Sequence, residues 1–210
     1  MIKKDNITNK FLYYGVKRFL DITFAILLIV LLSPILTIII FLIIIFDGFP
    51  VFYAWRVHGI QGEEFIGYKF RTMRRFADKD KEILEELNEM SGPVFKITND
   101  PRVTNLGSIL RKFSLDELPQ IYSVIKGDMS FIGPRPAGFN EFPNYEEWHY
   151  RKLSVKPGIS CLWQVSGRNN INDFDDWVKL DLEYIDNWSL WLDVKIFFKT
   201  IFVVLKGSGK

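Results

Sequence analysis

An uninterrupted apolar segment, Ile22 to Phe46, constrains this chain more than any other feature. Its 25 residues carry no charge and are bracketed by Asp21 and Asp47. As a straight helix the segment would be about 37 Å long, which exceeds the hydrocarbon core of a bilayer at about 30 Å. A buried helix of a soluble protein seldom stays apolar on every face for this length. A cleaved signal peptide fits poorly, because its apolar region is shorter and a cleavage site follows it. The segment therefore predicts insertion into a membrane.

The middle of this segment carries the pair Ser33-Pro34. Proline lacks an amide donor and clashes with the preceding turn, so we expect a bend there, with the Ser33 hydroxyl satisfying a freed carbonyl. Basic residues flank both ends, which by the positive-inside rule favours a cytoplasmic position for both. They are Lys10, Lys17 and Arg18 on one side and Arg56, Lys69 and Arg71 on the other. Two arrangements stay open: a re-entrant helix that returns to the same face, and an ordinary kinked spanning helix.

Charge and cysteine content exclude several classes of function. The chain has 27 Lys and Arg against 25 Asp and Glu, a net charge of +2, so nucleic acid is not an expected partner. The single cysteine, Cys161, excludes an intramolecular disulfide framework and a multi-cysteine metal site. Only two histidines are present, which argues against a His-rich zinc centre.

The organisation that we predict is a membrane segment followed by one further domain. Residues 1–50 comprise the basic flank and the membrane helix, and residues 51–210 form a domain with interfacial helices. The fold class is α+β and mostly helical, with a short β-hairpin and surface amphipathic helices. The expected strands are 51–57 and 65–73, and the expected helices are 78–90, 106–113, 119–126, 174–187 and 191–206. The last helix is apolar over most of its surface but charged in places, so it suits either a membrane surface or a core.

The adjacent acids Asp116 and Glu117 are the best candidates for chemistry. A structural alternative is a capping box, in which Ser114 and Glu117 only stabilise the start of a helix. Several basic residues, some held by Gly or Pro, favour an anion site suited to more than one phosphate. These are Lys69, Arg71, Arg111, Arg135 and Arg168.

Asp181 is a second informative acid, because it shares a helical stripe with aromatic residues such as Trp177 and Tyr184. A carboxylate on an aromatic face needs a partner. An arginine, a metal ion and a buried structural ion pair all remain open.

A series of motifs in a fixed order gives a family resemblance. From about Tyr13 to Gly207 the chain resembles the bacterial sugar transferases, the monotopic polyprenyl-phosphate phosphoglycosyl transferases. The motifs are Ser33-Pro34, Lys69-Phe70-Arg71-Thr72-Met73, Ser91-Gly92-Pro93-Val94-Phe95-Lys96, Ser114-Leu115-Asp116-Glu117-Leu118-Pro119-Gln120, Lys126-Gly127-Asp128-Met129-Ser130, Gly133-Pro134-Arg135-Pro136, Lys156-Pro157-Gly158-Ile159, Trp163-Gln164-Val165-Ser166-Gly167-Arg168-Asn169 and Leu180-Asp181-Leu182-Glu183-Tyr184.

The resemblance implies a helix that re-enters at Ser33-Pro34 and an active site on the cytoplasmic face of the inner or plasma membrane. The implied reaction transfers a sugar-1-phosphate from a UDP-sugar to undecaprenyl phosphate and releases UMP. Mg²⁺ is the implied cofactor. The stretch at residues 91–96 looks like that of members that use UDP-glucose or UDP-galactose for exopolysaccharide or capsule. The chain is expected to be the small form, without the multi-span N-terminal region of larger members.

The resemblance also implies roles for individual residues. Asp116 matches the nucleophile and Glu117 its acidic partner, and both are expected near the metal. Positions tied to phosphate or nucleotide handling are matched by Lys69, Arg111, Arg135 and Arg168. Asp181 and Asp193 match carboxylates of the C-terminal helices and are expected to contribute to substrate binding.

Two departures and one other class of function are relevant. Lys156 and the pair Ser160-Cys161 differ from the residues usual in the family, which bears on substrate detail rather than on the reaction.

The alternative function is a non-catalytic, membrane-anchored binding or scaffold protein of polysaccharide assembly. The sequence leaves the oligomeric state open, with a homo-oligomer among the options.

Overall fold

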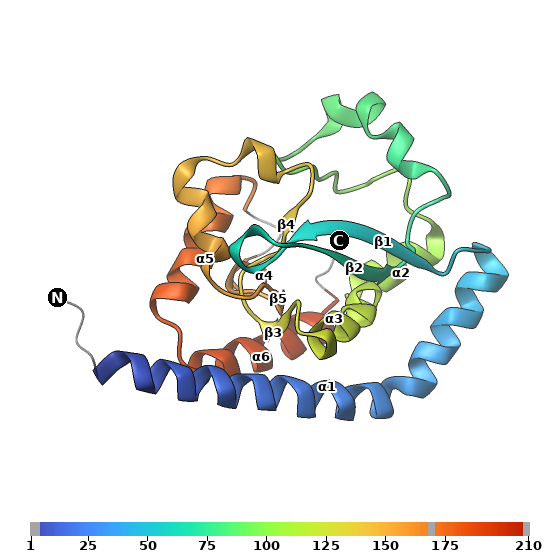
Figure 1. Ribbon diagram of the computed structural model, residues 1–210. Coiled ribbons are helices and arrows are strands. Elements are labelled where there is room, and N and C mark those ends of the chain that lie inside the picture. The colour runs from blue at the N-terminus through green and yellow to red at the C-terminus, as the bar shows by residue number, and fades with distance from the viewer. Residues whose placement is uncertain (1–4, 168–170, 208–210) are drawn as a thin grey trace.

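The computed structural model describes residues 5–167 and 171–207 (Figure 1). Helix α1, Asp5–Phe46, is 42 residues long and includes Pro34. Figure 1 shows that α1 runs along the base of the molecule and then bends to rise beside α2. The Ser33 hydroxyl donates to the carbonyl of Val30 at 2.8 Å, which is the carbonyl that Pro34 leaves without its i+4 donor. The predicted interruption is therefore a bend within one continuous helix.

The two halves of α1 pack against different parts of the domain. Ala25, in the first half, lies in a buried cluster with Val57 and Val124. Ile43, in the second half, lies in another cluster with Phe70 and Leu110. A bent helix contacts both clusters while most of its outward apolar side chains stay exposed.

Two small sheets lie above α1. Strands β1, Phe52–His58, and β2, Glu64–Phe70, form the predicted antiparallel hairpin, with Tyr53 opposite Lys69. The short strand β4, Ala137–Gly138, extends this sheet in the order β2-β1-β4. Strands β3, Ser130–Ile132, and β5, Gly158–Ser160, pair in parallel as a second sheet.

The predicted helices on either side of the acidic pair and at the C-terminal end are present. They are α2, Asn105–Lys112; α3, Ile121–Lys126; α5, Phe174–Asp186; and α6, Leu190–Leu205. A further short helix, α4, Leu162–Val165, precedes α5 in the chain. The helix expected over 119–126 begins as a 3₁₀ turn, η4, Leu115–Gln120, before α3 continues it. Gly127 ends α3 with a φ of 102°, a conformation that glycine adopts without strain.

The helix expected over 78–90 is wrong. This segment forms two 3₁₀ helices, η2, Ala77–Asp80, and η3, Glu82–Leu87. The expected apolar stripe does not pack on the domain, because Ile83 is 80% exposed and Leu87 is 54% exposed. Most helical stability comes from burying an amphipathic face, so the pattern alone does not sustain a regular α-helix here.

Helix α6 packs into the core on one side and is apolar but exposed on the other. One face is buried, with Ile196 only 1% exposed in a cluster with Tyr184 and Ile132. The other face exposes apolar side chains, including Phe202 at 67% and Leu205 at 75%. The helix lies against the first half of α1, where the Phe24 and Phe197 rings meet edge to face with their centroids 5.0 Å apart.

Candidate active site

The acidic pair lies in the first turn of η4, directly after α2. Ser114 separates the two helices in a left-handed conformation with a φ of 51°, an uncommon and strained choice for serine. Its side chain does not cap the turn that follows, so the capping-box alternative is wrong. The tight turn places Asp116 and Glu117 on one partly exposed edge of the domain.

Lys69 reaches Glu117 from the neighbouring strand β2. Its Nζ lies 2.8 Å from Oε1 of Glu117, and the side chains are 25% and 16% exposed. The same ammonium lies 4.9 Å from the centre of the Trp55 ring. Partial burial on an aromatic ring strengthens this ion pair relative to one at the open surface. The structure thus brings together Lys69 and the acidic pair, which are 48 residues apart in sequence.

Arg111, in the last turn of α2, completes this cluster. Its Nε donates to the Thr72 hydroxyl at 2.9 Å. Burial lowers the pKa of the Arg111 guanidinium, and the charge of Asp116 is the strongest opposing effect. Arginine stays protonated under all ordinary conditions, so its fixed positive charge acts on Asp116 through the electric field. Lys69 pairs with Glu117 and the charge of Arg111 acts on Asp116, so the candidate site comprises two acids and two cations.

Arg71, by contrast, belongs to the junction with the membrane helix. Its Nη2 donates to the carbonyls of Asp47 and Gly48 at 2.7 and 2.6 Å, at the end of α1. The residue is 7% exposed, and burial lowers its pKa. A cation that satisfies the last carbonyls of a helix stabilises that end. The structure thus gives Arg71 a position that anchors α1 to the domain.

A second charged cluster is buried beneath the turn formed by residues 133–136. Arg135 pairs with Glu141 through two contacts of 2.6 and 2.8 Å, and its backbone N–H donates to Asp181 at 3.2 Å. Asp181 in turn pairs with Lys152 at 2.8 Å, and neither side chain is more than 1% exposed. The buried ion pair that the sequence left open is the arrangement found at Asp181. Arg135 and Asp181 lie together but are already engaged with protein partners.

Asp193 lies at a different place, between α6 and α1. One carboxylate oxygen pairs with Lys17 at 2.5 Å, and the other accepts the Tyr184 hydroxyl at 2.7 Å. These contacts tie the C-terminal helices to the membrane helix. Arg168, the remaining predicted basic residue, lies outside the described residues.

Three partners that sequence reasoning missed are Thr72, Glu141 and Lys152. Thr72 lies between basic residues in its motif, and nothing in that pattern indicates that its hydroxyl accepts a hydrogen bond from Arg111. Glu141 follows Arg135 by six residues, and this spacing has no regular meaning outside a helix. Lys152 lies in an ordinary polar stretch. Only the tertiary fold brings it against Asp181.

Asp116 and Glu117 are the acids of this site that could contact a metal ion. Within residues 5–167 and 171–207 no group of three or more His, Cys, Asp and Glu side chains is arranged to hold a metal ion. Mg²⁺ commonly uses only one or two carboxylates, several waters and substrate phosphates. The oxygens of Asp116 and Glu117 fit that pattern.

Membrane association has support from one element. Within the described chain, the segment Tyr14–Phe46 of α1 is the single helical one long and apolar enough to cross a membrane, and the mean hydropathy of its most apolar window is 3.3. Only 11% of its most apolar window is buried, whereas a core helix of a soluble protein would be mostly covered. Such an exposed apolar helix is typical of a membrane protein.

Comparison with known proteins identifies relatives along nearly the whole chain. The family described as bacterial sugar transferase matches residues 12–207. A galactosyl transferase, CpsE, from Streptococcus agalactiae is 48% identical over 95% of this chain and 44% of that protein. An undecaprenyl-phosphate galactose phosphotransferase from Salmonella typhimurium is 42% identical over 92% of this chain and 41% of that protein. The exopolysaccharide production protein ExoY from Rhizobium meliloti is 40% identical over 92% of this chain and 87% of that protein. The chain thus spans less than half the length of the first two relatives.

Proposed function

This chain belongs to the bacterial sugar transferase family, and we propose that it is a phosphoglycosyl transferase that acts on a polyprenyl phosphate in a membrane. The donor is a UDP-sugar, with UDP-galactose or UDP-glucose as the leading candidates, and the acceptor is undecaprenyl phosphate. The products are undecaprenyl diphosphate sugar and UMP. The reaction is the first membrane step in the assembly of an exopolysaccharide or capsule. The printed names of the relatives, which include galactose transfer onto undecaprenyl phosphate, support this choice of substrates.

The observation that carries the proposal is the site formed by Asp116, Glu117, Lys69 and Arg111. A carboxylate can attack a phosphate only where the repulsion between the two anions is offset. Lys69 and Arg111 supply two fixed positive charges beside the acidic pair. Partial burial of the Lys69–Glu117 contact makes these charges more effective than they would be in water.

The proposed reaction proceeds in two displacements. An oxygen of Asp116 attacks the phosphorus that carries the sugar, a P–O bond to the leaving UMP breaks, and an aspartyl-phosphosugar is formed. An oxygen of undecaprenyl phosphate then attacks the same phosphorus, and the bond to Asp116 breaks. A phosphate monoester with a second pKa of about 6 is mostly dianionic at pH 7, so the acceptor needs no general base. This favours the covalent route over a ternary complex in which Asp116 is a base.

Asp116 and Glu117 are the residues that would hold Mg²⁺. The ion, when bound, neutralises part of the diphosphate charge. Lys69 orients Glu117 through the 2.8 Å contact, and Arg111 keeps its charge beside Asp116.

The proposed membrane arrangement is a re-entrant α1 with the domain on the cytoplasmic face, where UDP-sugars are made. The bend in α1 and the packing of its two halves on one domain support it (Figure 1). The exposed apolar face of α6 beside α1 supports contact with the same leaflet. This arrangement holds the site near the depth of lipid headgroups, where the acceptor phosphate lies.

The decisive measurement is UMP release from a panel of UDP-sugars with undecaprenyl phosphate and Mg²⁺. Asp116→Asn should abolish release and also abolish labelling of the protein by a sugar-phosphate-labelled donor when the acceptor is withheld. Asp176→Asn, an exposed residue paired with Lys179 on α5, is the matched control and should retain activity. Substantial turnover by Asp116→Asn would contradict the assignment. Absence of UMP release by the wild type with every donor would favour the scaffold alternative.

Membrane topology needs a separate test. Glu86→Cys on a Cys161→Ser background places one exposed thiol in the 3₁₀ segment η3. An impermeant thiol reagent should label it in inverted vesicles but not in intact cells. Labelling from outside would contradict the re-entrant arrangement.

A further inference from the structure

Two cations, Arg18 and Lys156, lie beside Gly127 at the C-terminal end of α3. A Cβ atom on Gly127 would lie 3.4 Å from Nη2 of Arg18 and 3.7 Å from Nζ of Lys156, so both charged groups reach the same side of this turn. Both residues are partly buried. Like charges this close repel each other, and partial burial strengthens the repulsion because less water screens it. An anion that contacts both cations would relieve this repulsion.

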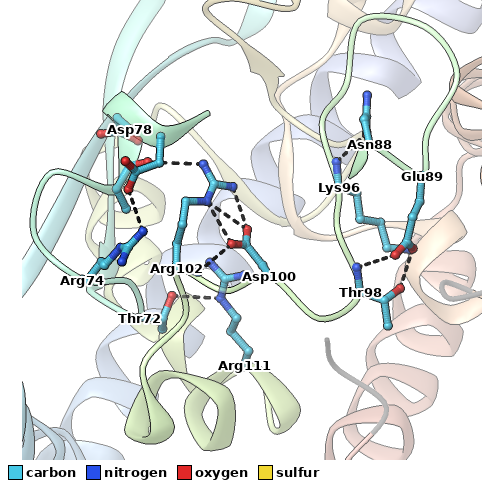
Figure 2. A network of polar contacts seen from close by, with 12 residues as sticks. Thr72, Arg74, Asp78, Asn88, Glu89, Lys96, Thr98, Asp100, Arg102 and Arg111 are labelled. Carbon is cyan, nitrogen blue, oxygen red and sulfur yellow. Dashed lines mark hydrogen bonds and ion pairs between the residues drawn. The ribbon is translucent and has the colours of Figure 1, made fainter. Parts of the chain in front are cut away.

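The protein supplies no such anion among the residues that the structure describes. Many of its cations pair with an acid, as the network around Arg102 in Figure 2 shows. Within the described part of the chain, neither Arg18 nor Lys156 has an acidic partner. The neighbouring Lys126 is already paired with Asp128 at 2.8 Å. An excess of two positive charges therefore remains at the end of α3.

The end of α3 does not require both of these charges. Arg18 donates from Nη1 to the carbonyl of Val124 at 2.5 Å and from Nη2 to that of Ile125 at 2.8 Å. These contacts satisfy carbonyls in the last turn of α3, where a cation is favourable. A guanidinium has five N–H donors, so Arg18 retains further donors for an anion. Lys156 is a second cation, for which the helix end gives no reason.

The backbone around Lys156 holds this cation in place. The residue precedes Pro157, which restricts it to extended conformations. The carbonyl of Pro157 accepts the backbone N–H of Ser130 at 2.9 Å, next to the pairing of β3 with β5. Both cations are thus positioned before any ligand arrives, which lowers the entropic cost of binding.

Arg18 lies just before the apolar segment of α1. It precedes Ile22 by four residues, which is roughly 6 Å along the helix. One turn earlier, Tyr14 stacks on Trp188 with the ring centroids 5.3 Å apart. Tyrosine and tryptophan are enriched at the level of lipid headgroups. Because α3 packs on α1, as Figure 1 shows, the end of α3 lies near the headgroups of the leaflet that α1 enters.

We propose that Arg18 and Lys156 bind the phosphodiester of an anionic phospholipid, such as phosphatidylglycerol, from the bilayer that holds α1. Guanidinium and ammonium groups are common protein donors to phosphate oxygens. Basic residues next to a membrane segment attract anionic headgroups, which are concentrated at this depth. The acidic pair lies in the first turn of η4, at the other end of the helical segment that Gly127 ends. The lipid site is therefore distinct from the candidate active site, and it ties the domain to the leaflet.

The experiment measures the Tm of the full chain in micelles of a neutral detergent that contain increasing mole fractions of one lipid. A lipid that binds only the folded protein raises Tm, and the dependence on mole fraction gives an apparent Kd. Phosphatidylglycerol should raise the Tm of the wild type more than phosphatidylcholine does. Lys156→Gln should weaken the apparent Kd for phosphatidylglycerol about fivefold, and Lys156→Arg should preserve it.

Two controls separate a specific site from general charge and from folding. Lys199→Gln removes an exposed charge from α6 and should leave the apparent Kd for phosphatidylglycerol unchanged. In phosphatidylcholine alone, the Tm of Lys156→Gln should equal or exceed that of the wild type, because the repulsion between Lys156 and Arg18 is removed. Neither measurement depends on UMP release, so the outcome is independent of the proposed function.

Five results would each overturn the inference. The wild type could show no preference for phosphatidylglycerol over phosphatidylcholine. An equal loss in Lys199→Gln would mean that the charges act diffusely. A Tm of Lys156→Gln below that of the wild type in phosphatidylcholine would give Lys156 a structural role instead. Stabilisation of the same size by inorganic phosphate would replace the lipid with a soluble anion. Tighter, Lys156-dependent binding of undecaprenyl phosphate than of phosphatidylglycerol would make the two cations part of the acceptor site.

Discussion

Replacement of Lys152 by Met is the sharpest test of how the charged interior supports the site. Lys152 and Asp181 lie 2.8 Å apart with side chains that are 1% and 0% exposed. Burial would lower the pKa of the Lys152 ammonium, but the charges of Asp181 and Tyr145 together raise it above its ordinary value, so Lys152 stays protonated beside Asp181. The methionine side chain keeps the apolar stem of lysine, and the substitution mainly removes the charge.

The expected cost follows from the geometry. Loss of one partner of a buried ion pair leaves the other charge uncompensated and typically costs about 3–5 kcal/mol. For a domain of this size such a loss lowers Tm by roughly 6–20 °C. The matched control is Lys179→Met, which breaks the pair of Lys179 with Asp176, where the side chains are 65% and 54% exposed. An exposed pair contributes little to stability, because water and salt screen it.

Thermal unfolding followed by tryptophan fluorescence suits this comparison. Trp163 and Trp177 stack with their ring centroids 4.2 Å apart in the same core, so their emission reports on this region. The double variant Lys152→Met with Asp181→Asn removes both charges and should recover part of the lost stability. If Lys152→Met were no more destabilising than Lys179→Met, the reasoning about the buried pair would be refuted.

Two further predictions concern the membrane helix and acid stability. Pro34→Ala restores the amide donor to the Val30 carbonyl and should straighten α1. A larger fraction of the thiol introduced by Glu86→Cys should then be labelled from outside the cell. Labelling at the level seen with Pro34 present would contradict a role of Pro34 in topology. Burial would raise the pKa of the Glu141 carboxyl group, but the charge and hydrogen bonds of Arg135 hold this pKa below its ordinary value. The ionised Glu141 therefore stabilises the fold at neutral pH, and this stabilisation is lost as the pH falls below about 4. Glu141→Gln should therefore be less stable than the wild type at pH 7, and the difference in Tm should shrink on acidification; a difference that grows in acid would refute this.

Local patterns predicted much of the fold, and the failures have physical causes. The hairpin of β1 and β2 follows from alternation around a turn, and helices α5 and α6 follow from a helical period with clear caps. The segment 78–90 shows the same period yet forms 3₁₀ turns, because the domain offers no surface for Ile83 and Leu87. A pattern indicates what a segment would do with a partner, and only the fold supplies the partner.

In the candidate site, too, the residue types follow from the sequence, whereas their partners follow from the fold. The acidic pair Asp116-Glu117 was apparent from the sequence, and the fold adds Lys69 and Arg111 beside it. Arg71 and Asp193 carry the expected charges, and the fold places them against α1, at its end and along its first half. Residue type indicates that a charge needs a partner, whereas the identity of the partner depends on contacts between residues far apart in the chain.

The apolar segment and the helix-bending Ser33-Pro34 at its centre could be predicted without the fold, because composition and the missing proline amide are local properties. The family could be predicted as well, since motifs in order carry that signal. The charges near Asp116, and those buried in pairs such as Lys152–Asp181, became apparent only from the packing of the folded chain. The physical reason is that the energy of a charge depends on its burial and its neighbours, and both are fixed when distant segments pack together.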